Sequence, residues 1–429
     1  MNELLGLFFF LFFLLLFKNW KALQIDSVPS FYFQVFFAVK VSCGLVFWWI
    51  YSYHYHFRDT SDAFRYFDDA MVLADMLKTN PVDYFKFLFG IGLDDPNTQK
   101  YFDQMHGWTS SYSYGLINDN PLIIRLNAIV GLLSMGSFHV HTVCMAFLSS
   151  IGAWFACKGL AMFSAFRARL FVAILMVLPS YLFWSSSVLK EVPLLLGLGF
   201  LLYLICSISY RGWSVKLFLL LAAVVAGLFF VKGYVIMAFL PALLFFILDS
   251  FIKKPVLSFV GIVLLSIVAA GCADVFYPSG DFYYVLGKKQ VDFYNVANSQ
   301  NAGSVIEIPQ VNGFFSFVKN SPEYLVNAYL RPFPNEGSGL LYLFCKAEIV
   351  VTLLLLVLVI FTSKFHCKVQ VRMILMSLLF ILILGLIIGA TVPILGAIVR
   401  YKIPALFLFA FALCFCLDEV KWKKIIPLK

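Results

Sequence analysis

Residues 42–70 read SCGLVFWWIYSYHYHFRDTSDAFRYFDDA, an aromatic apolar run that is followed at once by a charged segment. Residues 42–56 contain no Asp, Glu, Lys or Arg, whereas residues 57–70 contain two Arg and four Asp. An abrupt change of this kind is typical of a chain that leaves the hydrocarbon of a membrane and enters water. The stretch therefore predicts a membrane-spanning segment that ends near residue 56, with a polar loop beyond it.

The composition of the whole chain supports the same interpretation. Of the 429 residues, 62% are hydrophobic and 13% are charged, whereas soluble domains contain about 45–50% apolar and about 25% charged residues. The net charge of +9 does not predict nucleic-acid binding, because Lys and Arg stand mainly at the ends of apolar runs. The nine Cys show neither disulfide nor metal-ligand spacing.

Apolar runs recur along the chain at lengths that approach the roughly 20 residues needed to cross a membrane. They predict an all-α fold, a polytopic transmembrane helical bundle of about 10–12 spans that forms one integral membrane domain over residues 1–429. The predicted spans are residues 4–17, 41–55, 138–162, 170–186, 192–209, 217–231, 234–248, 256–276, 340–362, 373–391 and 403–417.

The distribution of charge predicts the orientation of these spans. Short basic loops alternate along the chain with loops of mixed charge, and loops rich in Lys and Arg stay on the cytoplasmic side. Lys40 is assigned to the first basic loop, together with Lys18 and Lys21. The long loops, residues 56–137 and 277–339, are expected outside with interfacial helices in them, and the C-terminus is expected in the cytoplasm.

The charged segment predicts a helix that begins near Ser61. Asp62, Tyr66 and Asp69 then fall at i, i+4 and i+7 along one side. Apolar residues also recur at helical spacing, which predicts an amphipathic helix along the bilayer surface with these side chains buried in lipid. The alternative is a solvated first turn in which Asp is favoured by the helix dipole. The apolar positions are Ala63, Phe67, Ala70, Leu73 and Leu77.

Five basic residues are expected at the outer membrane boundary. The positive-inside bias disfavours Lys and Arg at that boundary, so their presence there suggests a function. A ring of such cations suits a lipid-linked phosphate or diphosphate, and the alternative is that each cation pairs internally, as in Lys190 with Glu191 or Arg331 with Glu336. The outer-loop aromatics Trp108, Tyr112 and Tyr114 are candidates for stacking on sugar rings. The boundary cations are Arg125, Lys190, Lys232, Arg331 and Arg400.

The acidic segment DAFRY, the turn FWSSSVLKE at residues 183–191 and the late segment RYKIP together resemble bacterial membrane glycosyltransferases of the GT-C superfamily, in particular envelope-polysaccharide members of Bacteroidetes type. The resemblance implies that Asp62, or else Asp59, is the general base and that Tyr66 is its aromatic neighbour. It implies that outer-face residues bind the donor phosphate: Lys190, Glu191, Arg331 and Arg400. The chain departs from the family in an extra apolar segment before the acidic loop and in lacking a large C-terminal soluble domain.

The expected activity is transfer of a sugar from a polyprenyl-phosphate donor to a glycan or lipid acceptor at the periplasmic face of the inner (cytoplasmic) membrane. The expected partners are the lipid-linked donor, the acceptor and membrane lipids, and a divalent cation stays open as a cofactor. One alternative is an O-antigen or capsule polysaccharide polymerase or ligase. Another is a lipid-linked glycan flippase or transporter, which would place charges in the middle of spans; the predicted spans contain almost none.

Overall fold

The computed structural model describes residues 2–54, 61–108, 119–272, 282–299, 304–363 and 367–419. These residues are helical almost throughout, and among them β structure is limited to isolated bridges, so the expected all-α class is confirmed. The chain divides into two compact units. The first comprises Met1–Val172 and Leu182–Gly233, and the second comprises Ala173–Tyr181 and Tyr234–Lys429.

Six helical segments in the described part of the chain are long and apolar enough to cross a membrane. A seventh results if α19 (Leu395–Tyr401) and α20 (Ile403–Cys416), which meet at a 43° bend, form one span. The six segments are Ser30–His54 (α2, Ser30–Trp49, with η2, Ile50–His54), α7 (Phe138–Ala161), α10 (Glu191–Arg211), α12 (Gly233–Ile252), Leu340–Phe361 in α17 (Leu340–Thr362) and α18 (Lys368–Thr391).

The difference from the sequence-based count has a local cause. The predicted spans at 217–231 and 256–276 correspond to shorter apolar helices, α11 (Val215–Val231) and α13 (Pro255–Gly271). The predicted span at 170–186 is divided between α8 (Ala165–Met176) and α9 (Pro179–Trp184). Proline lacks the N–H that would continue the preceding helix, so the interruption at Pro179 follows from the sequence.

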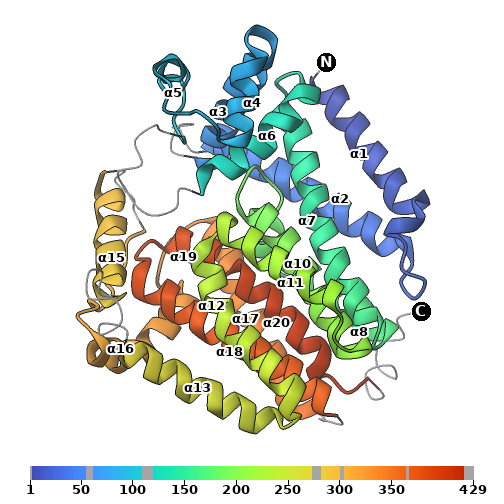
Figure 1. The fold of residues 1–429 in the computed structure, drawn as a ribbon, viewed down its shortest axis with the longest axis vertical. Helices are drawn as coiled ribbons and strands as arrows, with labels where there is room; N and C mark the ends of the chain where they lie inside the picture. Colours follow the sequence, from blue (N-terminus) through green and yellow to red (C-terminus); the bar gives the residue numbers. More distant parts are fainter. Residues whose placement is uncertain are drawn as a thin grey trace. The chain divides into compact units, whose positions relative to one another are not determined.

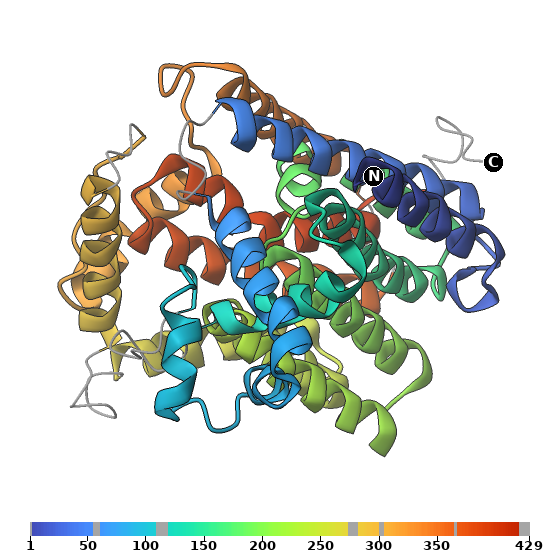
Figure 2. The same ribbon diagram turned by 90° about the horizontal axis from the view of Figure 1, so that it is seen from above.

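In the first unit, α1 (Asn2–Asn19), α2, α7 and α10 pack side by side, and α1 and α2 are adjacent in both views (Figure 1; Figure 2). Phenylalanine rings fill the space between the first three helices, with Phe13 and Phe147 stacked at 4.1 Å. Helices α7 and α10 meet through glycine. A Cβ atom on Gly199 would lie 1.9 Å from the carbonyl oxygen of Gly152, so the two backbones touch, as small residues allow between membrane helices.

A group of shorter helices follows α2 in the first unit: α3 (Asp62–Thr79), α4 (Pro81–Phe89), η4 (Pro96–Thr98), α5 (Gln99–Phe102) and α6 (Asn120–Ser134). Helices α4 and α6 pack on α3 (Figure 1). Ala63, Phe67, Ala70 and Leu73 are consequently buried in protein. The expectation that this apolar face enters the lipid is wrong, because neighbouring helices cover it.

In the second unit, α18 packs against α13, α15 (Phe282–Ser299), α16 (Phe314–Tyr329) and α20. Helices α16 and α18 also meet at glycine, since a Cβ atom on Gly389 would lie 1.8 Å from the carbonyl oxygen of Tyr324. Arg372 of α18 donates to the carboxylate of Asp249 in α12 at 2.6 Å and thereby joins the ends of two helices. The second unit is therefore organised around α18.

The glycine contact between α7 and α10 makes a stability prediction. We expect Gly199→Ala to lower the thermal unfolding midpoint of the purified protein in detergent, because a methyl group forced against backbone costs about 1–3 kcal/mol. Gly227→Ala is the matched control, since nothing lies within 4 Å of a Cβ atom at that position in α11. That variant should be unchanged or slightly more stable, because alanine favours helix. Equal midpoints for the two variants would contradict the contact.

Candidate functional site

The chain is irregular and buried between α9 and α10. Residues 185–190 are not helical, and all six residues are buried. Ser149 of α7 donates to the carbonyl of Ser185 at 2.6 Å. The hydroxyl of Ser187 has no hydrogen-bond partner within the described part of the chain. Buried backbone outside regular structure needs protein or water partners for its polar groups, so this buried non-helical segment is a candidate functional element.

Lys40 approaches this segment from α2. Its side chain is fully buried, and its Nζ donates to Ser185 Oγ at 2.5 Å. The assignment of Lys40 to a basic loop is wrong, because α2 begins at Ser30 and not at residue 41, so Lys40 lies inside a spanning helix. A lysine at such a position is costly, and it usually marks a functional site.

Lys190 is the second buried cation, at the end of the irregular segment. Its Nζ lies 2.5 Å from Asp119 Oδ1 and 5.5 Å from the centre of the Tyr66 ring. Burial lowers the pKa of Lys190; Asp119 opposes this effect, Lys232 lowers the pKa further, and Asp62 raises it. The structure thus brings together Asp62, Tyr66 and Lys190, which the sequence proposed as parts of one site.

Glu191 and Lys232 complete this group of residues. Lys232 Nζ lies 2.6 Å from Glu191 Oε1, and the two side chains are 4% and 0% exposed. The suggested pairing of Lys190 with Glu191 is therefore wrong, because Lys190 pairs with Asp119 and Glu191 pairs with Lys232. We refer to Asp62, Tyr66, Asp119, Lys190, Glu191 and Lys232 as the charged cluster.

Asp69 has a structural role that the sequence did not reveal. Its fully buried carboxylate accepts hydrogen bonds from the backbone N–H groups of His106, Gly107 and Trp108 at 2.8, 2.8 and 2.9 Å. Burial raises the pKa of Asp69, and these three donors act in the opposite direction. The sequence did contain one signal, the helical spacing that puts Asp69 on the same face of α3 as the buried residues Tyr66 and Leu73.

The turn that Asp69 holds also positions Tyr66. Asn120 donates to the carbonyl of Gly107 at 2.6 Å and accepts from the hydroxyl of Tyr66 at 3.0 Å. Tyr66 is therefore fixed at its hydroxyl by Asn120, while the ammonium of Lys190 lies beside its ring. A fixed aromatic side chain next to a buried cation gives the charged cluster a defined geometry.

Arg125 forms contacts with residues of the first unit. Its Nε donates to the carbonyl of Phe87 at 2.8 Å, near the C-terminal end of α4, where a cation is favoured by the helix dipole. Its guanidinium also lies 4.8 Å from the ring centre of Trp108, which is completely buried. Trp108 therefore cannot stack on a sugar in this structure. Asp59, Tyr112 and Tyr114 lie outside the described residues.

Arg331 and Arg400 belong to the second unit. Arg331 donates to Glu336 at 2.5 Å, and Glu336 also accepts from the backbone N–H of Phe333, so the internal pairing considered from the sequence is confirmed for this arginine. Arg400 is half-buried near the end of α19. The role expected for both arginines in donor binding stays a prediction.

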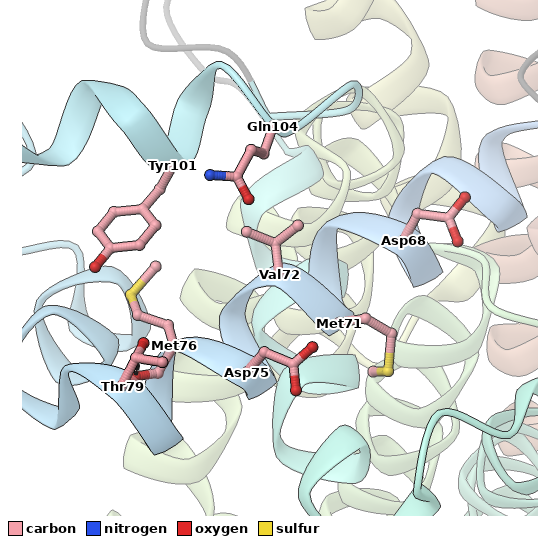
Figure 3. A pocket seen from close by; sticks show the side chains of 8 residues that line it. All are labelled: Asp68, Met71, Val72, Asp75, Met76, Thr79, Tyr101 and Gln104. Atoms are coloured by element: carbon pink, nitrogen blue, oxygen red, sulfur yellow. Dashed lines mark hydrogen bonds between the residues drawn. The ribbon is translucent and has the colours of Figure 1, made fainter.

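An open hollow of about 380 Å³ lies beside α3 and α5, apart from the residues predicted for the site. Figure 3 shows Asp68 and Asp75 along α3, with Tyr101 and Gln104 on the opposite side. Asp75 forms an exposed ion pair with Lys78 at 2.7 Å. Within the described residues, no group of three or more His, Cys, Asp or Glu side chains is arranged to hold a metal ion.

Comparison of the chain with protein-family models, with curated proteins and with solved structures gave no match.

The buried position of Lys190 predicts a pH dependence of stability. Because burial holds its pKa in the folded protein below 10.5, the unfolded chain binds more protons between the two values. The free energy of unfolding should therefore rise as the pH increases from the folded value towards 10.5. The measurement is the thermal midpoint between pH 7 and 10.5, with Lys190→Met for comparison. The same slope in both proteins would refute the assignment.

Proposed function

We propose that this chain is a membrane glycosyltransferase that transfers a sugar from a polyprenyl-phosphate donor to a glycan or lipid acceptor. The proposal places it in the inner (cytoplasmic) membrane, with the charged cluster at the outer face and the C-terminus in the cytoplasm. The observation that carries the proposal is the buried Lys190, which lies beside the Tyr66 ring and interacts electrostatically with Asp62 and with Lys232, the partner of Glu191.

The lysines supply positive charge, which a phosphate leaving group requires. Lys40, Lys190 and Lys232 all contact the stretch from Ser185 to Glu191 or belong to it, and all three are buried. Glu191 is fully buried with them, whereas the Asp119 side chain is 32% exposed. Positive charge in a dry site stabilises a departing phosphate far better than it does in water. A phosphate oxygen that replaced Asp119 at Lys190 would form a charge-assisted hydrogen bond.

Asp62 is the residue assigned as the general base. It is half-buried at the first position of α3, where the helix dipole favours the ionised carboxylate. The nearby ammonium of Lys190 favours the same form. In the proposed step the carboxylate accepts the proton of the acceptor hydroxyl as its oxygen attacks the anomeric carbon, and the bond to the polyprenyl phosphate breaks.

Asp62→Asn tests this assignment. The substitution keeps the shape of the side chain and removes the base, so transfer should fall about 100-fold or more, while the amount of protein in the membrane stays the same. Asp75→Asn is the control on the same helix, because Asp75 is exposed and pairs with Lys78. The measurement is the lipid-linked glycan that accumulates in a deletion strain complemented with each variant. Normal glycan in the Asp62→Asn strain would remove the proposed base.

Transport of a lipid-linked glycan is a second candidate that three observations favour. Lys40 lies inside the spanning helix α2, and Glu348 is buried inside α17. Lys402, 3.9 Å from Glu348, lies where α19 and α20 bend. The expectation that spans contain almost no charge is therefore wrong for Lys40 and Glu348. Buried ionisable groups and broken helices at membrane depth are characteristic of transporters.

Proteoliposomes that contain a fluorescent polyprenyl-phosphate glycolipid separate the two candidates. We expect wild-type protein to consume the glycolipid only when an acceptor is added, with no movement of the glycolipid between leaflets. Glu348→Gln and the exposed control Glu323→Gln are compared in the same assay. Movement between leaflets that is retained in Glu323→Gln and lost in Glu348→Gln would establish transport instead.

A further inference from the structure

The second unit contains a hollow of about 400 Å³ that is lined by none of the residues of the charged cluster. One wall is α15, and the other is the extended segment at residues 310–312. Its volume falls within the range of small-molecule sites, about 300–1,000 Å³. Two tyrosines, two glutamines, one asparagine and one lysine supply most of the polar lining: Tyr284, Tyr294, Gln290, Gln310, Asn312 and Lys288.

Hydrogen bonds fix the frame of this hollow. The hydroxyl of Tyr294 donates to the carbonyl of Ile306 at 2.9 Å and accepts from the backbone N–H of Ile308 at 3.0 Å. Gln290, which is buried, donates to the carbonyls of Ile308 and Pro309 at 3.2 and 3.1 Å. The extended segment is thus held against α15 by side chains from one helix, which pre-organises the walls for a ligand.

The groups around the opening remain accessible. Tyr284 is 64% exposed, and Lys288, Gln310 and Asn312 are also exposed. Gly287 lets the extended segment approach α15 closely, because a Cβ atom there would lie 3.0 Å from the carbonyl oxygen of Val311. The hollow therefore combines an exposed aromatic ring, two planar amides and one cation on a fixed frame.

We propose that this hollow binds a saccharide that carries an acidic group. The C–H face of a sugar ring packs on an aromatic ring such as Tyr284. Amides both donate and accept hydrogen bonds, which matches sugar hydroxyls, and Gln310 and Asn312 supply this chemistry. Among the described residues that line the hollow, Lys288 is the charged one, and it selects a carboxylate on the saccharide. A purely apolar ligand would leave the amides and the ammonium without partners.

This inference rests on the proposed function in one respect, since it identifies the bound saccharide as the acceptor glycan. Binding itself does not depend on catalysis. It can therefore be measured on full-length protein in nanodiscs, with no donor present, so that a failure of binding is distinguishable from a failure of transfer.

The experiment uses saturation-transfer difference NMR with two probes. One is a tetrasaccharide of alternating glucuronic acid and N-acetylglucosamine, and the other is neutral maltotetraose. Wild-type protein should bind the acidic probe, and Tyr284→Ala should weaken that binding roughly tenfold through the lost ring contact. Lys288→Gln should remove the preference for the acidic probe. Asp62→Asn should bind the acidic probe as wild type does.

Tyr210→Ala is the matched control, because Tyr210 in α10 is 61% exposed and lies outside the hollow. Each variant is accepted only if its thermal midpoint equals that of the wild type. Absence of binding to both probes, or equal binding by wild type and Tyr284→Ala, would overturn the site. Equal affinity of wild type for the two probes would overturn the acidic specificity.

Discussion

Burial of lysine ammonium groups inside a helical membrane protein is the constraint on which the first unit depends. An isolated ammonium in hydrocarbon is expensive, so each one requires a hydrogen bond or a counter-charge. The three lysines meet this requirement in different ways. Lys40 uses a serine hydroxyl, Lys190 uses Asp119, and Lys232 uses Glu191. Lys40 and Lys190 thereby involve the non-helical residues 185–190, and Lys232 is tied to Glu191, the first residue of the helix that follows them, which explains why backbone irregularity and charge occur together.

The supporting structure around this stretch is rigid for two separate reasons. Helices α7 and α10 are in backbone contact at Gly152 and Gly199, which fixes the helix that begins at Glu191. In addition, Asp69 accepts hydrogen bonds from three consecutive backbone N–H groups and so secures the turn on which Asn120 and Tyr66 rely. Helix α3 therefore carries two carboxylates with different roles. Asp69 accepts hydrogen bonds from the backbone, and Asp62 is the residue proposed for the chemistry.

The sequence predicted the helical class, the membrane character and the association of Asp62, Tyr66 and Lys190. Hydropathy determines the first two features directly, and helical spacing places Asp62 and Tyr66 on one side of a helix, whereas the expected meeting with Lys190 came from the predicted outer-face topology and the family resemblance. It did not predict the burial of α3 by α4 and α6, because an amphipathic face fits lipid and protein equally well. The sequence-based prediction was also wrong at Lys40, because this charge was taken to lie in a loop before the span at residues 41–55. Which carboxylate pairs with which lysine depends on tertiary contacts between Asp119, Glu191, Lys190 and Lys232 that no local pattern encodes.

The bond between Lys40 and Ser185 has a consequence for how the protein is made. Its two partners are separated by 145 positions along the chain. During synthesis α2 enters the membrane long before the serine exists, and a central lysine disfavours insertion by about 2.5–3.5 kcal/mol. Among the helices translated before α9, α2 packs on α1 and α7. The contact between Lys40 and Ser185 therefore forms only after α2 has entered the membrane, so the insertion of α2 cannot draw on it.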